Sequence, residues 1–385
     1  MKLHSDRVLV GTNRAHDLPW VGSVRRESEV ENLMYGVRFE SKPGPLLVNG
    51  ARVGSVGGEG SRLSAPRVPI RPGLEKRLRS RARSGHGGTR AGASVLVLGL
   101  AGWMGACHST PAEFDRTRAL EWVERQVAGG PRIPGSVGHG RWKSEMVNVL
   151  EGLADDVRLH AFEANSIPMT NVIASFRPDL GERIFLMAHW DTRPHADEDP
   201  DPARRADPVP GANDGASGVA VLLEVARQLS AEAPRRGVDL FFVDGEDSGT
   251  QGEPDSWALG SQALAAALVG AGYRPRLGIL LDMVGDRDLR IPQEGFSLAW
   301  APVETRWLFE VAAGLGLSAF DPVPGKMVTD DHLPFLRRGI PCVDLIDLDY
   351  PYWHTVADTP DKVSAESLGQ VGDLVMAVVR AETLP

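Results

Sequence analysis

Continuously apolar runs alternate with helical patterns over the last two thirds of the chain. The runs that predict strands are 171–176, 183–189, 238–243, 277–284, 296–300 and 342–346. The stretches with helical spacing are 116–127, 141–153, 218–229, 259–269, 304–314 and 365–381. Strands without polar alternation are typical of strands that are covered on both faces. The pattern therefore predicts an α/β fold with a doubly wound, largely parallel sheet and helices on both faces.

The N-terminal part of the chain predicts no packed core. Residues 1–75 show no sustained period of 3.6 or 2, and Gly, Pro, Ser and Arg recur through them. They are either a disordered extension or the product of an upstream start codon outside the natural protein, and we favour the second. Residues 76–90 are strongly basic and lead into an apolar run that ends just before Cys107. This order predicts a signal peptide over 76–107, and the run is shorter than the ~20 residues that span a bilayer.

The end of that apolar run suggests a lipid anchor. Met104-Gly105-Ala106-Cys107 resembles a bacterial lipoprotein signal, in which the Cys becomes the lipidated first residue, although Met104 stands where Leu is usual. The alternative is a plain secretory signal with a chance Cys. We expect an exported protein, periplasmic or extracytoplasmic, that touches the membrane only through this anchor. Only Cys342 then remains, so no intramolecular disulfide is available.

The charge of the 385-residue chain also changes sign near Cys107. Residues 1–106 carry 17 basic and 8 acidic side chains, whereas the remaining 279 carry 25 and 43. The size of the acidic segment 108–385 fits one domain with a sizeable core. Its negative charge would repel nucleic acid and anionic membrane surfaces, so neither is an expected partner of the folded part.

Polar residues gather where the predicted strands end. They are His189, Asp214, Glu246, Asp247, Asp282 and His354. In a doubly wound sheet the ligand crevice lies at the carboxyl ends of the strands, so these residues can converge there. Imidazoles with carboxylates suit Zn²⁺, and a carboxylate beside a ligand can act as a general base.

Each of these residues alone has a simpler interpretation. Asp214 precedes a predicted helix and could be its N-cap, and Glu246 with Asp247 could form a charged turn. Asp282 could be half of a buried ion pair. Their occurrence in five segments, each at a strand end or helix start, favours a common site. The segment 192–210, rich in Pro and Asp, is expected to be a solvated loop, with ion binding as a lesser alternative.

The motifs HWD, NDGASG, GED, LDM and WHT, in this order, resemble the zinc aminopeptidase-like metallopeptidase family over about 114–383. In its two-metal members, the matching positions would give one zinc to His189 and Asp282 and the other to Asp247 and His354. Asp214 would bridge them. Glu246 would be the base that activates the shared water. Asp247 stands where many relatives have Glu, and it still offers a carboxylate.

Four segments resemble the glutaminyl-peptide cyclotransferases within that family: GPRIPGS, DSWALGSQ, TDDHLPFLRRGIP and DYPYWHT. This resemblance implies a single zinc held by Asp214, Asp247 and His354, with His189 supporting them or idle. Trp353 would form an apolar wall against the substrate. Asp282 and Asp331 would form a carboxyl network that ties Glu246 in place. The simpler alternatives are that Trp353 packs the core and that Asp331 caps a helix.

The resemblance therefore implies an enzyme that converts the N-terminal glutamine of a peptide or protein into pyroglutamate and releases ammonia. Zn²⁺ is the expected cofactor, with one ion required and two possible. A two-zinc aminopeptidase that hydrolyses N-terminal residues is the alternative on the same residues. A membrane-anchored binding domain without activity is a third, from a different class.

Overall fold

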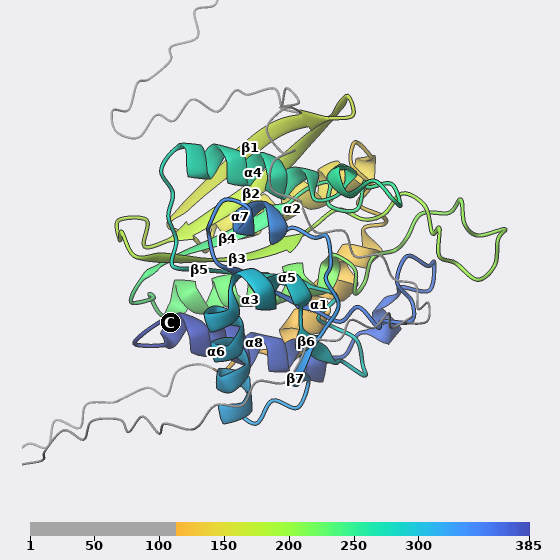
Figure 1. The fold of residues 1–385 in the computed structure, drawn as a ribbon. Helices are drawn as coiled ribbons and strands as arrows, with labels where there is room; N and C mark the ends of the chain where they lie inside the picture. Colours follow the sequence, from red (N-terminus) through yellow and green to blue (C-terminus); the bar gives the residue numbers. More distant parts are fainter. Residues whose placement is uncertain (1–112) are drawn as a thin grey trace, which may run out of the picture. The chain divides into compact units, whose positions relative to one another are not determined.

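The computed structural model describes residues 113–385, so the segments 1–75 and 76–107 lie outside the described residues (Figure 1). A six-stranded sheet runs in the order β1-β2-β4-β3-β5-β8. The strands are β1 (Asp156–Ala164), β2 (Ile167–Phe176), β3 (Arg183–His189), β4 (Gly237–Val243), β5 (Leu277–Asp282) and β8 (Cys342–Ile346). The pairs β4–β3, β3–β5 and β5–β8 are parallel, whereas β1 and β2 are antiparallel additions at one edge. The sheet is thus mixed and mostly parallel, as predicted.

Helices cover both faces of this sheet. Successive side chains of the central strands point to opposite faces, and both sets are apolar and packed. In β3, Ile184, Leu186 and Ala188 pack into one core, and Phe185 and Met187 pack into another. The first core contains residues of α1 (Arg116–Ala128), α2 (Val137–Glu151), α3 (Ala216–Ala231), α6 (Pro302–Gly314) and α8 (Ala365–Arg380). The second contains residues of α4 (Leu259–Gly270) and α7 (Leu333–Leu336). The prediction of helices on both faces is confirmed. Among the described helices, none has the length and hydropathy to cross a bilayer.

Most predicted elements are present within a few residues of their expected ends, but one has the wrong type. The apolar run 296–300 forms the helix α5 (Gly295–Trp300) instead of a strand. The carboxylate of Glu294 accepts hydrogen bonds from the backbone N–H groups of Phe296 and Ser297, which caps a helix start. A short parallel pair, β6 (Ile291–Gln293) and β7 (Phe320–Pro324), was not predicted either.

Glu294 allows a prediction about stability. Burial opposes its ionisation, but His332 and the α5 backbone amides outweigh burial and lower the pKa of Glu294 from 4.5 to about 2. An acid with a depressed folded pKa stabilises the fold above its unfolded pKa and loses that contribution as the pH falls. Glu294→Gln should therefore lower the free energy of unfolding by ~2–3 kcal/mol at neutral pH, measured by denaturant titration. The difference from wild type should shrink as the pH falls below about 4.5. An equal difference at every pH would contradict this origin.

Candidate metal centre

The carboxyl ends of the parallel strands surround a cavity of about 300 Å³. His189 ends β3, Asp282 ends β5, and Glu246 with Asp247 follows β4. The predicted residues in the cavity wall are Asp214, Glu246, Asp247, Asp282, Trp353 and His354. His189 is buried behind this wall, against Asp214 and Asp282. The convergence predicted from the strand ends is therefore present.

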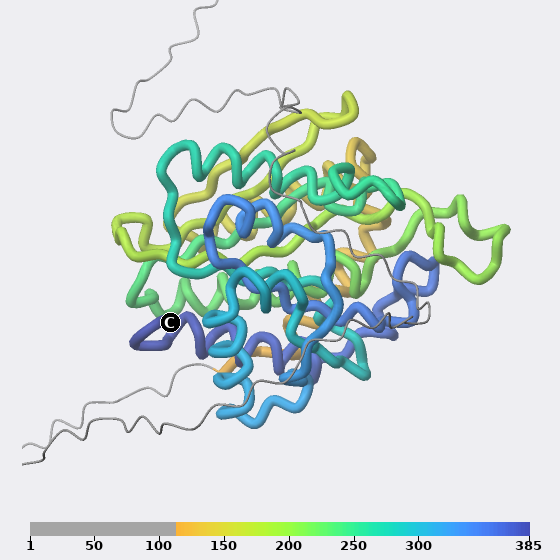
Figure 2. Tube along the Cα trace, in the orientation of Figure 1, coloured from red at the N-terminus to blue at the C-terminus, as the bar shows by residue number. Residues whose placement is uncertain are grey.

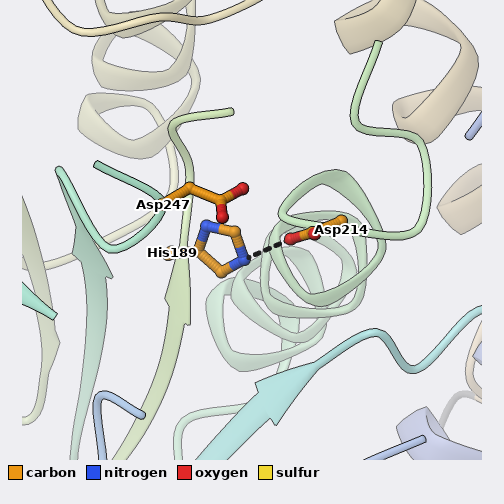
Figure 3. Close-up of side chains that lie close together, drawn as sticks. All are labelled: His189, Asp214 and Asp247. Carbon is orange, nitrogen blue, oxygen red and sulfur yellow. Dashed lines mark ion pairs between the residues drawn. The ribbon is translucent and has the colours of Figure 1, made fainter. Parts of the chain in front are cut away.

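Asp214 lies between the two imidazoles. Its Oδ1 is 3.1 Å from Nε2 of His189 (Figure 3). Its Oδ2 is 3.7 Å from Nε2 of His354. Nε2 of His189 also lies 3.1 Å from Oδ1 of Asp282, and Nε2 of His354 lies 3.1 Å from Oδ1 of Asp247. The carboxylate of Asp214 is thus shared by two half-sites, one with His189 and Asp282 and the other with Asp247 and His354.

The polar atoms of this cluster fit a metal ion. Oδ2 of Asp214 and Oδ2 of Asp247 are buried and have no hydrogen-bond partner among residues 113–385. His189, Asp214 and Asp247 each offer one ligand atom, and these atoms lie within 4.8 Å of one another. Buried carboxylates without partners cost free energy, which a bound cation would recover. Nitrogen and carboxylate oxygen are the donors that Zn²⁺ accepts in proteins. The residues therefore form a suitable metal centre.

Burial also affects the protonation of Asp214. Burial, together with the negative charge of Asp247, raises the pKa of Asp214 to about 7. Asp214 does not act as the N-cap of α3, since Gly215 holds that position and no side chain caps the helix. Instead, the Asp214 backbone N–H donates to Asp358, 3.1 Å away, and its own carboxylate stays available. The simpler interpretation of Asp214 as a helix cap is wrong.

Gly215 is required at the turn after Asp214. Its φ is +89°, which residues with a side chain rarely adopt. A Cβ at this position would lie 2.7 Å from the carbonyl oxygen of Asp191 and 3.1 Å from Cε1 of His189. The glycine therefore lets the turn pass close to the end of β3 and brings Asp214 next to His189.

Arg132, from the GPRIPGS segment, supports the same turn. Its buried guanidinium donates to the carbonyl oxygens of Trp190 and Gly211, at 3.0 and 2.6 Å. Burial lowers the pKa of Arg132 to about 10, against the opposing charges of nearby Asp residues, so the side chain stays charged at neutral pH. Arg132 thus ties the end of β3 to the segment that carries Asp214. The sequence shows the GPRIPGS motif, but it does not indicate the hydrogen bonds that Arg132 makes.

Glu246 faces the cavity beside the ligand set. The backbone N–H groups of Glu246 and Asp247 donate to the two carboxylate oxygens of Asp191, at 3.1 and 3.2 Å. Burial, reinforced by the negative charges of Asp247 and Asp330, raises the pKa of Glu246 well above its usual value. A carboxyl group with such a pKa is suited to accept a proton and return it.

Asp330, which was not predicted as a site residue, lines the cavity together with Asp282. Asp331, its predicted counterpart, is fully buried outside the cavity lining. Burial and the charges of Asp282 and Asp331 raise the pKa of Asp330 well above its usual value. Asp330 therefore occupies the place that was expected for Asp331. Two adjacent Asp residues gave no signal of which one faces the cavity.

Apolar side chains form the rest of the cavity wall. Trp353 is part of it and stacks on His354, with the ring centroids 3.8 Å apart. Trp257 lies nearly parallel to His354 on the rim, with centroids 6.0 Å apart. The other apolar members are Pro254, Met283, Met327, Val328, Ile346 and Leu348. The cavity thus combines a charged floor with a wall suited to an aliphatic or peptide group.

Comparison with known proteins identifies the family. The model of peptidase family M28 matches residues 171–379, which contain every predicted site residue. The chain belongs to peptidase family M28. Among solved structures, a Bacteroides thetaiotaomicron glutaminyl cyclase bound to N-acetylhistamine is 36% identical, with a TM-score of 0.69. The match covers 71% of this chain and 100% of that one.

Two further relatives of this M28 chain carry different descriptions. A Zn-dependent exopeptidase from Parabacteroides distasonis is 35% identical, with a TM-score of 0.68, and the match covers 71% of this chain and all of that one. The glutaminyl-peptide cyclotransferase of Drosophila melanogaster is 27% identical over 274 residues, which cover 63% of this chain and 74% of the fly protein. Proteins similar to this M28 chain are therefore described both as glutaminyl cyclases and as a zinc-dependent exopeptidase.

Proposed function

We propose that this chain is a zinc-dependent glutaminyl-peptide cyclotransferase. The observation that carries the proposal is the position of Glu246, in the wall of a cavity with apolar sides and beside His354, whose Nε2 lies 3.7 Å from Asp214 and 3.1 Å from Asp247. The 36% identity to a bacterial glutaminyl cyclase over that protein's whole length supports the same activity. Its substrate would be the N-terminal glutamine of a peptide or protein.

Asp214, Asp247 and His354 would hold the zinc, which would supply Lewis-acid polarisation of the side-chain amide carbonyl. The cavity would bend the glutaminyl residue so that its α-amine approaches its own amide carbon. Glu246 would accept the proton that the amine loses and donate it to the departing amide nitrogen. One C–N bond forms, one C–N bond breaks, and ammonia leaves. Trp353 would pack against the aliphatic part of the side chain, and Asp282 with Asp330 would orient Glu246.

A two-zinc aminopeptidase is the second candidate, because His189 and Asp282 complete the other half-site around Asp214. Titrating zinc into metal-free protein distinguishes the two. We expect glutaminyl cyclisation to return fully at about one equivalent, as for a single Lewis-acid centre. Activity that appears only with the second equivalent, together with cleavage of a leucyl peptide, would favour the aminopeptidase.

We also propose that the mature protein is exported and begins at Cys107, where a lipid could anchor it. This proposal is supported by the basic and apolar segments before Cys107, which lie outside the described residues. Mass analysis of the protein from its native cells should find a mature N-terminus at or near Cys107. An intact N-terminus at Met1 would contradict export by this route.

A further inference from the structure

The segment 192–210 is more than the solvated loop that its composition predicted. Its tip is exposed and extends away from the sheet (Figure 2, light green). Its first part is buried instead, with Arg193 only 5% exposed and Asp199 only 3%. The expectation holds for the tip alone. The buried part lies against residues of the metal centre.

Arg193 binds the backbone of a proposed metal ligand. Its Nη1 donates to the carbonyl oxygens of Asp247 and Gly249, both at 3.1 Å. Its Nε and Nη2 donate to the two carboxylate oxygens of Asp197, at 2.8 and 2.6 Å. The planar guanidinium group fits such a forked arrangement, which the single ammonium group of Lys cannot reproduce.

Asp197 in turn faces the imidazole of His354. Its Oδ1 lies 3.4 Å from Nδ1, while Nε2 of the same ring points toward Asp247. A carboxylate at one ring nitrogen fixes the orientation and tautomer of an imidazole that binds metal through the other. The backbone of His354 has a φ of +53°, which is uncommon outside glycine, so surrounding contacts must hold it. Glu198 supplies one of them, since its N–H donates to the carbonyl oxygen of His354 at 3.3 Å.

Trp257 completes the arrangement from the other side. The Arg193 guanidinium lies over its ring, 4.7 Å from the centroid, and the ring is tilted only 8° from that of His354. A cation over an aromatic face is a favourable contact. Arg193 therefore contacts Asp247 directly, by a hydrogen bond. It also contacts Asp197 and Trp257, which both lie next to His354.

We propose that Arg193 and Asp197 form a clamp that positions two of the zinc-holding residues, Asp247 and His354. The clamp rests on the proposed metal centre but not on the reaction performed there. Both are positioning residues, because neither lies in the cavity wall. Asp197 is about one third exposed, but its partner Arg193 is buried, so loss of the pair is expected to lower stability as well. The effect specific to the clamp is therefore the change in zinc affinity of the folded protein.

The test is zinc affinity of the full chain, measured by competition with a chromophoric chelator. Asp197→Asn should weaken zinc binding by ~10–100-fold, the usual effect of removing a partner of a metal-binding His. Its melting temperature is expected to fall, because the buried Arg193 loses a charged partner, so affinities are compared at a temperature at which both proteins are folded. Asp207→Asn is the matched control, since Asp207 pairs with Arg204 at the exposed tip of the same segment. This control should leave zinc affinity unchanged.

A double-mutant cycle tests whether the two residues act as one unit. Arg193→Lys should also weaken zinc binding, and the Arg193→Lys/Asp197→Asn double variant should lose less than the product of the two single effects. Should Arg193→Lys fail to fold, the comparison of Asp197→Asn with Asp207→Asn decides alone. Wild-type zinc affinity in Asp197→Asn would overturn the clamp. A wild-type chain that binds no zinc would instead overturn the proposed function.

Discussion

Glu246→Gln is expected to keep its zinc but to lose turnover by ~10²–10⁴-fold, the usual contribution of a positioned general base. Gln has nearly the same shape and keeps a polar group, but it cannot accept the proton that the attacking amine loses. The carboxylates and imidazole proposed to hold the metal are unchanged in this variant. Zinc content should be measured by elemental analysis, and kcat by ammonia release from a glutaminyl peptide.

Glu163→Gln serves as the control for this experiment, because Glu163 is an exposed carboxylate on β1 at the far edge of the sheet. It should retain both zinc and turnover. Full activity in Glu246→Gln would contradict the assignment of the base. Loss of zinc in Glu246→Gln would show that Glu246 holds the metal, which the geometry does not predict.

Asp214→Asn should abolish activity through loss of metal. The Asp214 carboxylate is shared by both half-sites, so a neutral amide removes one charged donor from either possible zinc. Outer partners of a metal site are worth 10–100-fold in affinity, and a direct ligand should therefore cost more than ~10²-fold. Chelator competition measures the affinity, and elemental analysis after dialysis measures retention.

The matched control is Asp179→Asn, which removes an exposed carboxylate in the turn between β2 and β3. It should bind zinc like wild type. If Asp214→Asn also bound zinc with wild-type affinity, the centre would lie elsewhere. The observed proximity of Asp214 to both imidazoles would then reflect electrostatic attraction alone.

The central strands and the site were predictable for one physical reason. Strands buried on both faces must be continuously apolar, so the first polar residue after each run marks the strand end and the crevice. This reasoning located His189 and Asp282 directly, whereas after β4 it indicated only the polar turn 244–247, in which Asp247 is the last residue. It could not find β1, because that strand lies at the sheet edge and most of its side chains are at least partly exposed.

Other features depend on contacts between distant parts of the chain. The run 296–300 has a strand-like composition, and the side chain of Glu294 makes it a helix. The choice between Asp330 and Asp331 depends on the rotation of a short turn, which sequence does not specify. Arg193 reaches Asp247 across 54 positions of the chain, so no local pattern indicates their contact.

The number of bound zinc ions is likewise not determined by the sequence pattern. Asp214 lies between His189, which is paired with Asp282, and His354, which is paired with Asp247, so candidate ligands for a second ion lie next to those for the first. The cyclase proposal needs only one ion, since its nucleophile is the substrate's own amine and no activated water is required. Metal stoichiometry therefore bears directly on the reaction.

The most direct test of the proposed function follows the nitrogen of the substrate. The purified full chain with zinc is incubated with a peptide whose N-terminal glutamine carries an isotopic label on the side-chain amide nitrogen, and all products are weighed. We predict labelled ammonia together with a peptide that keeps its full length and has lost one ammonia. Free labelled glutamine with a peptide shortened by one residue would contradict cyclisation and establish aminopeptidase activity instead.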